Sequence, residues 1–370
     1  MWTIILVFIG LLCALISSTH SQGTCQNLQE QFGICINIKS CPILLNLLKE
    51  NPGDPQVGNF LRASVCSYQD KDPWVCCPSS VNRGNISTNY GLEGDRGRKE
   101  ITNTPYGPLY PPDCGFSNAT FSRLLDGEPA SLGTWPWITA LGYRNSKNPN
   151  VPKWLCGGVL ISSRHVLTAA HCVYERTDLY KVRIGDLDLN DDYDGATPFE
   201  DFIERKTVHP QYNPEIYTND VAVLKTSHEV PFTSMVRPIC LPVDDYWRYR
   251  NLENTHPLIA GWGSVYFRGP SSSRLLQAQF PIRTQEECKY AYRNLPMLID
   301  DRVLCAGYAR GGNETCLGDT GGPLMNVNLQ IQHTFYVIGV SYGFKCNELG
   351  FPNIYSKISA FLDFITNQLV

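Results

Sequence analysis

The sequence has no excess of charge of either sign. Its 370 residues include 31 basic and 35 acidic side chains, for a net charge of −4. Proteins that bind a nucleic-acid backbone usually carry a basic surplus, so we expect no nucleic-acid partner. Charged residues are scarce, at 18% against about 25% in an average soluble domain, while 43% of residues are apolar. This composition excludes a chain that is disordered throughout and a coiled coil.

The sequence also has no apolar run of about 20 residues, the length that a membrane-spanning helix needs. Its apolar run at residues 4–16 is followed by the small residues Thr19 and Ser21. This pattern favours a signal peptide over residues 1–21, cleaved before Gln22, and therefore a secreted protein with no membrane span. The alternative is a single anchor helix.

Cysteine, by contrast, is abundant. Fifteen cysteines are too many for a chain kept reduced in the cytosol, which again indicates an oxidising compartment. Removal of the leader takes Cys13 with it and leaves fourteen, an even number that can all pair. Six of these crowd together and eight are spread over the rest of the chain, namely Cys25, Cys35, Cys41, Cys66, Cys76 and Cys77, then Cys114, Cys156, Cys172, Cys240, Cys288, Cys305, Cys316 and Cys346.

The two cysteine groups predict two folded modules. The first, residues 25–77, is too small to be held by an apolar core alone, so disulfides must stabilise it. A stretch rich in Gly, Pro, Asn and Ser follows and lacks apolar periodicity, so we expect a linker and activation segment over residues 78–123. Asn85 and Asn118 lie in glycosylation sequons.

Residues 124–370 show short apolar segments separated by turn signals and few helical periods, which predicts an all-β fold of two packed antiparallel barrels. The end of the chain differs. There Ile358, Phe361, Leu362 and Ile365 recur at the spacing of a helix face and predict a closing amphipathic helix.

Three segments in this second module carry groups suited to acyl transfer. Such chemistry needs a nucleophilic hydroxyl, an imidazole to take its proton and a carboxylate to orient the imidazole. His171 follows an apolar strand among small residues, Asp220 begins another buried strand, and Thr320 stands in the glycine-rich segment 318–323.

Taken in this order, these segments resemble the chymotrypsin-like serine protease family over residues 124–370. The resemblance implies His171 as general base, Asp220 as its orienting carboxylate and Thr320 at the nucleophile position, with the N–H groups of Gly318 and Thr320 as the oxyanion hole. It also implies the disulfides Cys156–Cys172, Cys288–Cys305, Cys316–Cys346 and Cys114–Cys240, the last of which would tether the two modules after cleavage.

The first module resembles the clip domain of arthropod proteases, through its adjacent Cys76 and Cys77 after Trp74 and Val75 and through its six-cysteine spacing. The resemblance implies the disulfides Cys25–Cys76, Cys35–Cys66 and Cys41–Cys77. The whole chain is therefore similar to clip-domain serine proteases and their non-catalytic homologues.

Members of this family are made as zymogens. The resemblance implies cleavage after Arg123 by an upstream trypsin-like protease, which frees the amino group of Leu124 to pair with Asp319. A buried charge is stable only with such a partner. Arg123 could instead be an ordinary linker residue.

The sequence departs from the family pattern at the nucleophile, where Thr320 replaces Ser. A β-branched side chain is stiff at χ1, so we expect its oxygen to be unable to meet His171 and a substrate carbonyl at once. Displacement by about 1 Å can cost on the order of 100-fold in rate. The change therefore favours absent or strongly reduced activity.

The expected specificity pocket also departs from the pattern. Glu314 stands at the pocket floor, Asn353 replaces a pocket-lining Gly, and Tyr342 replaces a Trp before Gly343. The changes at Glu314 and Asn353 reduce the volume of the pocket, so a long basic residue should fit poorly. Asn313 lies in a third sequon at the pocket edge.

An acidic segment contains Asp186, Asp188 and Asp194, which offer hard oxygen ligands. The family resemblance implies that Ca²⁺ could bind this loop, although the fold requires no cofactor. The alternative is a solvated acidic loop.

Three functional hypotheses follow. The first is a secreted clip-domain homologue of an arthropod immune, melanisation, clotting or venom cascade that acts as a binding cofactor or decoy towards a protease or its substrate. The second is an active endopeptidase that uses Thr320 with altered specificity. The third makes the clip domain a surface-binding or antimicrobial module.

Overall fold

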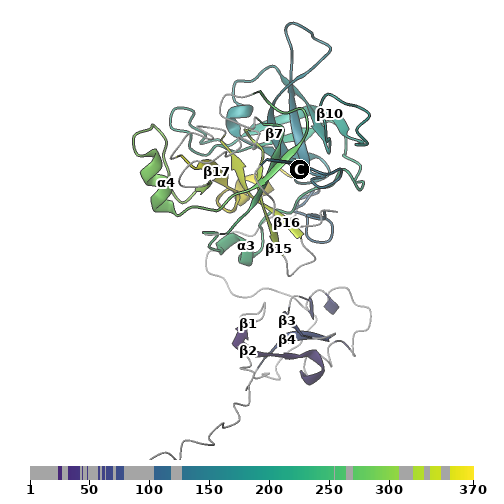
Figure 1. The fold of residues 1–370 in the computed structure, drawn as a ribbon, viewed down its shortest axis with the longest axis vertical. Coiled ribbons are helices and arrows are strands. Elements are labelled where there is room, and N and C mark those ends of the chain that lie inside the picture. The colour runs from purple at the N-terminus through teal and green to yellow at the C-terminus, as the bar shows by residue number, and fades with distance from the viewer. Residues whose placement is uncertain are drawn as a thin grey trace, which may run out of the picture. The chain divides into compact units, whose positions relative to one another are not determined.

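The fold is given by a computed structural model. It describes residues 24–26, 32–41, 44, 48, 57–58, 61–62, 64–69, 72–78, 104–117, 127–253, 255–263, 270–307, 320–328, 334–342 and 351–370. The chain forms two compact units, residues 1–96 and 97–370, which are described separately (Figure 1). None of the helices in the described part has the length and apolar character needed to cross a bilayer.

The first unit is a small antiparallel sheet with strand order β1-β2-β4-β3. Its strands are β1 (Thr24–Gln26), β2 (Phe32–Asn37), β3 (Val65–Gln69) and β4 (Asp72–Pro78), with the short helix η1 (Ile38–Ser40) after β2. Its buried apolar cluster is small and comprises Cys41, Leu44, Val57, Leu61 and Val75. The disulfides Cys35–Cys66 and Cys41–Cys77 cross-link it. Cys76 is also in a disulfide, whereas the side chain of Cys25 lies outside the described residues.

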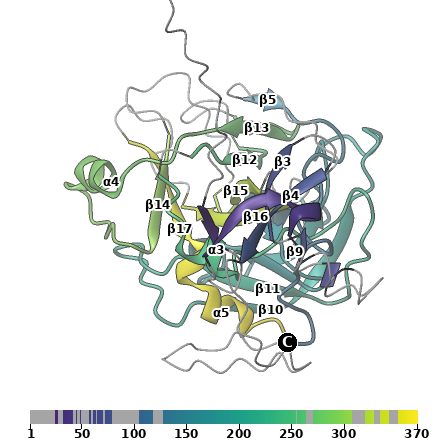
Figure 2. The same cartoon turned by 90° about the horizontal axis from the view of Figure 1, so that it is seen from below.

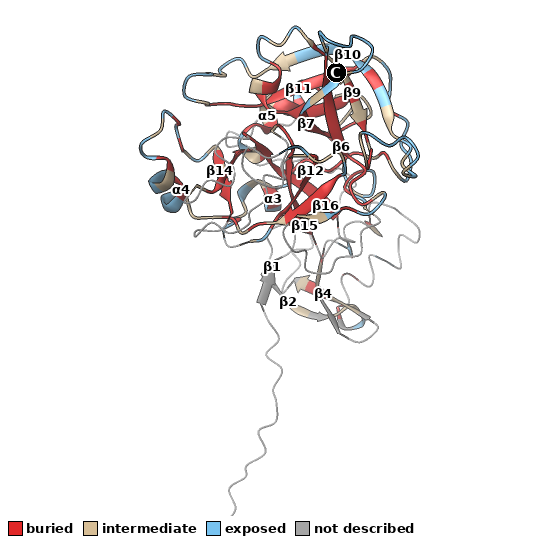
Figure 3. Cartoon of the chain, turned by 45° about the horizontal axis from the view of Figure 1, so that its top comes forward, coloured by how far each residue is buried: buried red, intermediate tan, exposed pale blue. Residues whose placement is uncertain are grey.

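The first half of the second unit is a closed six-stranded barrel, with strand order β10-β11-β8-β7-β6-β9. Its strands are β6 (Ile138–Tyr143), β7 (Lys153–Leu160), β8 (His165–Thr168), β9 (Leu179–Ile184), β10 (Phe199–Val208) and β11 (Ala222–Thr226). Every residue of β6 and β8 is buried, whereas β10 presents exposed residues along its length (Figure 3).

The second half is a seven-stranded antiparallel sheet with the order β14-β17-β16-β15-β12-β13-β5. Its neighbouring strands β12, β13 and β5 can be followed in Figure 2. The strands are β5 (Glu128–Pro129), β12 (Leu258–Gly261), β13 (Leu276–Gln279), β14 (Val303–Ala306), β15 (Pro323–Asn328), β16 (Thr334–Ser341) and β17 (Asn353–Lys357). The expected all-β class is confirmed, and the first barrel closes. Within the described residues, the edge strands β14 and β5 do not pair.

Polar caps begin two of the helices that follow the barrel strands, α3 and α4. In α4 (Gln285–Tyr292), the Thr284 hydroxyl accepts from the Glu287 N–H and the Glu287 carboxylate accepts from the Thr284 N–H. This reciprocal pair satisfies two amides that have no partner within the helix. In α3 (Asp245–Tyr249), Asp244 accepts from the N–H of Trp247.

The closing helix differs from the prediction. It consists of a short turn, η3 (Ile358–Ala360), and a five-residue helix, α5 (Leu362–Thr366). The break falls at Phe361, whose φ and ψ of −117° and 10° are not helical. The predicted apolar face is nevertheless buried, since Ile358, Phe361, Leu362 and Ile365 all belong to the main core. Packing of that face, rather than a continuous helix, orders the end of the chain.

Residues 104–117 also differ from the prediction. We expected a linker there, but the segment belongs to the second unit and packs against it. Tyr106 contacts the core of the first half and Leu109 contacts that of the second. Its few apolar residues follow neither a helix nor a strand period, so pattern analysis could not detect the packing.

Candidate active site

His171 lies in the turn after β8, within the short helix η2 (Ala170–Cys172). A disulfide from Cys172 to Cys156 fixes this turn to the neighbouring strand β7. The backbone N–H of His171 donates to Asp220 Oδ1 at 2.9 Å, and its ring Nδ1 lies 2.7 Å from Asp220 Oδ2. The imidazole is therefore held by its own backbone, by a disulfide and by a carboxylate.

Asp220 lies two residues before β11, and its side chain is fully buried. A buried carboxylate is stable only if its charge is met by donors, and His171 supplies two of them. Because a carboxylate only accepts hydrogen bonds, Nδ1 of His171 carries a proton, and in the neutral imidazole Nε2 then presents its lone pair. The carbonyl of Asp220 in turn accepts from Ser356 Oγ at 2.7 Å.

Thr320 completes the group. Its Oγ1 lies 2.5 Å from His171 Nε2 and 3.1 Å from the carbonyl oxygen of Tyr342. The stiff side chain therefore reaches the imidazole in the free protein, and the expected conflict with a substrate carbonyl stays a prediction. The rotamer of Thr320 places its hydroxyl within hydrogen-bond distance of the His171 ring, but the Tyr342 carbonyl is a second acceptor for the same hydroxyl.

The three side chains come from both halves of the unit. His171 and Asp220 are attached to the first barrel, and Thr320 precedes β15 of the second sheet. The two halves are joined at this point, since the Gly157 N–H in β7 donates to the Thr320 carbonyl at 2.9 Å. Two adjacent glycines in a strand, Gly157 and Gly158, were the available signal for such a close approach of another backbone.

Gly321 is required beside the nucleophile position. Its φ is +83°, in the left-handed region, and a Cβ there would lie 2.7 Å from the Gly157 carbonyl oxygen and closer still to Thr168 Oγ1. Its N–H donates to the Ser341 carbonyl at 2.8 Å. Only glycine satisfies both the conformation and the space.

Tyr342 does not present its ring to solvent at the site. It is 6% exposed and packs in the apolar cluster with Tyr292 and Ile354. Burial raises the pKa of its phenol, and the nearby Asp220 charge raises it further. Asn353, also predicted to line the pocket, is buried at the start of β17 opposite Ala306.

Other predicted site residues lie outside the described residues. These are the oxyanion glycine Gly318, the activation residues Arg123, Leu124 and Asp319, the pocket residues Glu314 and Gly343, the sequon residues Asn85, Asn118 and Asn313, and the disulfides Cys25–Cys76 and Cys316–Cys346. The predicted disulfides Cys114–Cys240 and Cys288–Cys305 are present in the described part.

The acidic segment does not gather as a calcium site. Asp194 accepts from the Asp188 N–H at 2.6 Å, and Asp186 accepts from the Leu187 N–H at 2.9 Å. The one cluster of three metal-ligand side chains in the described part is Cys156, His171 and Cys172, and its two cysteines are joined in a disulfide.

A cation is already present within the acidic segment. The guanidinium of Arg183 lies 2.6 Å from Asp186, 2.9 Å from Asp192 and 3.1 Å from Glu200. The carboxylates that calcium would need are thus paired with an arginine or with backbone amides, and they do not fit the ion. Sequence analysis missed Arg183 because its role appears only when β9 and β10 pair.

The arrangement of a buried aspartate, an oriented imidazole and a hydroxyl matches the comparisons with known families. A model described as Trypsin matches residues 124–365. The chain belongs to the trypsin family. A second model, described as the regulatory CLIP domain of proteinases, matches residues 25–77. The trypsin-like module is thus preceded by a clip module, as the cysteine spacing indicated.

Relatives share both modules. A venom serine protease of Bombus ignitus, Bi-VSP, is 46% identical over 93% of this chain and 91% of its own length. The proclotting enzyme of Tachypleus tridentatus is 36% identical over 94% and 90%. The crystal structure of the Drosophila Grass clip serine protease of the Toll pathway matches with a TM-score of 0.60 and 25% identity, over 94% of this chain and 97% of that one.

Proposed function

We propose that this clip-domain member of the trypsin family is a secreted component of an extracellular arthropod cascade, cleaved after Arg123, with a triad that is assembled but turns over slowly. Its main role would be that of a binding cofactor or decoy. The observation that carries this proposal is Thr320 Oγ1, held 2.5 Å from His171 with Asp220 behind it.

The residual chemistry follows from the geometry. In its neutral form, with Nδ1 donating to Asp220, the His171 imidazole takes the proton of Thr320 on Nε2 as the Thr320 oxygen attacks a peptide carbonyl. The N–H groups of Gly318 and Thr320 would stabilise the resulting oxyanion. The imidazolium then passes its proton to the leaving amine, and water repeats the sequence on the acyl-enzyme.

Two features should make this reaction slow. The γ-methyl of Thr320 lies on the carbon that carries the attacking oxygen, so it crowds the incoming carbonyl. The Tyr342 carbonyl, 3.1 Å from the same hydroxyl, competes with His171 for its single proton. We expect the turnover rate to be reduced by more than the roughly 100-fold that a 1 Å displacement costs. The reduction should be smaller than the roughly 10⁶-fold that follows loss of the nucleophile.

Activation and specificity belong to the same proposal. An upstream trypsin-like protease would cut after Arg123, and the new Leu124 ammonium would pair with Asp319. Buried Asn353, with Glu314, would disfavour a long basic side chain in the pocket. Relatives named as a proclotting enzyme, a phenoloxidase-activating factor and a Spaetzle-processing enzyme support a partner or substrate within a proteolytic cascade.

The test compares the chain cleaved after Arg123 with its Thr320→Ser, Thr320→Ala and His171→Ala variants on a panel of peptide substrates. We expect weak hydrolysis in the parent, loss of that hydrolysis in both alanine variants, and an increase of at least about tenfold in kcat for Thr320→Ser. Hydrolysis that persists in His171→Ala would contradict the assembled triad. Parent activity equal to that of Thr320→Ser would contradict slow turnover.

A purely non-catalytic cofactor is the second candidate. The contact between Thr320 and the Tyr342 carbonyl favours it, because that acceptor can hold the hydroxyl proton away from the imidazole. In this case the parent and Thr320→Ala would hydrolyse nothing and would bind a partner protease equally. Restoration of turnover by Thr320→Ser alone would show that the pocket and the oxyanion hole are sound.

A further inference from the structure

Residues 104–117, called the strap here, lie on the N-terminal side of the predicted cleavage site but pack on the unit that would be released. The disulfide Cys114–Cys240 is their one covalent link to it among the described residues. The segment also makes non-covalent contacts with both halves of that unit.

Tyr106 makes the first contact of the strap, in a site formed by His165, Arg164 and Lys225 that is called the Tyr106 box here. The ring centroid of Tyr106 lies 5.5 Å from that of His165, and the charged groups of Arg164 and Lys225 each lie 5.8 Å from it. The Tyr106 N–H donates to the Leu369 carbonyl at 3.4 Å, at the end of the chain. A cation over an aromatic face is attracted to the ring, and more strongly where water is excluded.

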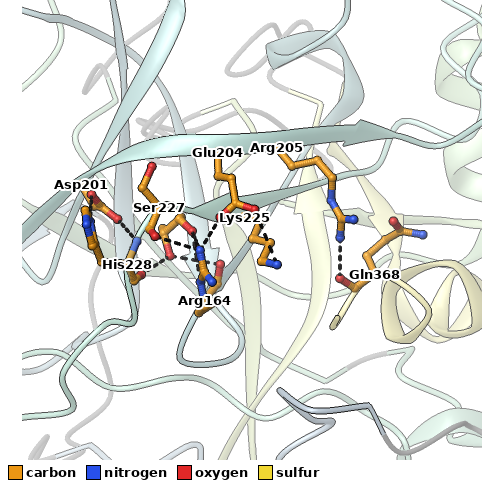
Figure 4. Close-up of polar contacts among 9 residues, drawn as sticks. Arg164, Asp201, Glu204, Arg205, Lys225, Ser227, His228 and Gln368 are labelled. Atoms are coloured by element: carbon orange, nitrogen blue, oxygen red, sulfur yellow. Dashed lines mark hydrogen bonds and ion pairs between the residues drawn. The ribbon is translucent and has the colours of Figure 1, made fainter.

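The box is built independently of the strap. Arg164 Nε donates to the Thr226 carbonyl at 3.2 Å and its Nη2 to the Ser227 carbonyl at 2.9 Å, and it also pairs with Glu204 (Figure 4). Only 14% of the Arg164 side chain is exposed. Since three groups outside the strap fix its guanidinium, the surface that receives Tyr106 should persist when the strap is absent.

The end of the chain is held on the same face. Arg205 Nη2 donates to the Gln368 carbonyl at 3.2 Å, which fixes the residue next to Leu369 (Figure 4). Lys225 pairs with Glu204 at 3.7 Å. The Leu369 carbonyl, which accepts from the Tyr106 N–H, is therefore also held by contacts outside the strap.

The far end of the strap inserts into the second half. Gly115, with φ of +73°, donates its N–H to the Pro238 carbonyl and accepts from the Phe335 N–H, both at 2.9 Å. A Cβ at this position would lie 2.5 Å from the Phe335 carbonyl oxygen, so the backbones approach as closely as glycine permits. Ser117 Oγ donates to the Thr134 carbonyl at 2.6 Å.

We propose that the strap is a non-covalent dock that keeps the N-terminal fragment, clip module included, bound to the catalytic unit after cleavage, whether or not Cys114–Cys240 is formed. The inference rests on the proposed cleavage after Arg123. It goes further in assigning retention to the Tyr106 box and the Gly115 insertion, with the disulfide as a second attachment.

The test uses the full chain with Cys114→Ser and Cys240→Ser together, cleaved after Arg123 and run on size-exclusion chromatography without reductant. Sequencing of the new N-terminus at Leu124 separates a failure of cleavage, which counts against the proposed function, from a failure of docking. We expect the two fragments to co-elute. Separation of the fragments would overturn the proposal.

A matched pair of variants in this background tests the box itself. Tyr106→Ala should speed dissociation of the fragments by at least about tenfold, the factor that loss of roughly 1.4 kcal/mol gives. Tyr110→Ala changes a tyrosine in the same segment that is 53% exposed and outside the box, near Asp244, and it should change the rate much less than Tyr106→Ala does. Equal rates for the two variants would refute a role for Tyr106.

If the cysteine variant fails to fold, the parent with its disulfide intact provides the decisive measurement. Amide hydrogen exchange across residues 104–117 is compared before and after cleavage. Unchanged protection of the Tyr106 and Gly115 amides supports the dock. Loss of that protection on cleavage overturns it, because the segment would then be held by its disulfide alone.

Discussion

Acid should destabilise the second unit through His165, at the start of the strand that leads to His171. The ring is fully buried beneath Tyr106, with Nδ1 2.8 Å from Ser162 Oγ and no hydrogen-bond partner for Nε2 in the described part of the chain. Burial, together with the nearby charges of Lys225, Arg205 and Arg164, lowers its pKa from 6.5 to about 3.

The direction of the effect follows from linkage. Between its folded and unfolded pKa values, His165 binds a proton only in the unfolded chain, so stability is complete above about pH 6.5 and falls as the pH drops below it. At about 1.4 kcal/mol per pKa unit, the loss is about 2 kcal/mol at pH 5. It would approach 5 kcal/mol near pH 3.

The assay is urea unfolding at about pH 8 and pH 5, followed by tryptophan fluorescence, for the parent and for His165→Asn. Asn keeps a polar group near Ser162 but does not titrate, so it should lose about 2 kcal/mol less than the parent between the two pH values. Subtraction removes the contribution of carboxylates that titrate in both proteins. Equal losses in the two proteins would refute the assignment of the acid sensitivity to His165.

Three further predictions concern the supports of the active site and the acidic loop. Gly321→Ala should lower the free energy of unfolding by more than about 2 kcal/mol, because left-handed backbone costs about 1–2 kcal/mol and the new Cβ also collides with backbone. Gly195→Ala is the control, since that glycine also has a positive φ but its Cβ would meet only a leucine side chain at 3.3 Å. It should lower the free energy of unfolding by less in the same urea assay. Ser356→Ala leaves the buried carbonyl of Asp220 without this donor and should cost about 1–3 kcal/mol by thermal unfolding, with a fall in any kcat. Arg183→Met leaves the buried Asp186 carboxylate without its cation and should lower the free energy of unfolding by on the order of 3 kcal/mol. Millimolar Ca²⁺ or a chelator should leave the Tm of the parent unchanged. A rise in that Tm with Ca²⁺ would contradict our assignment of Arg183 as the internal cation.

Much of the fold could be predicted because the strands are marked by short, buried and largely apolar segments such as 137–141 and 221–224. It also placed His171, Asp220 and Thr320 in one site through a family resemblance, and the structure brings these side chains together. Their separation along the chain, 49 residues for the first pair and 149 for His171 and Thr320, shows why spacing alone could not have done so.

What escaped prediction depends on contacts between distant segments. In the sequence, Tyr106 is an isolated aromatic residue within a loop, and nothing near it indicates a contact. Its partners Arg164 and Lys225 come from two other segments. Arg183 reads as an ordinary strand residue until its neighbours fold round it. Neither role leaves a periodic signal in its own segment, so local pattern analysis cannot recover it.

The hydrogen bond from Gly157 to the Thr320 carbonyl has a consequence for heat tolerance. It joins a strand of the barrel that carries His171 and Asp220 to the segment that carries the hydroxyl. If the two halves move apart slightly on warming, the hydroxyl leaves the imidazole while each half still keeps its own strands. Any catalytic activity should therefore vanish at a temperature below the melting of either half, and cooling should restore it.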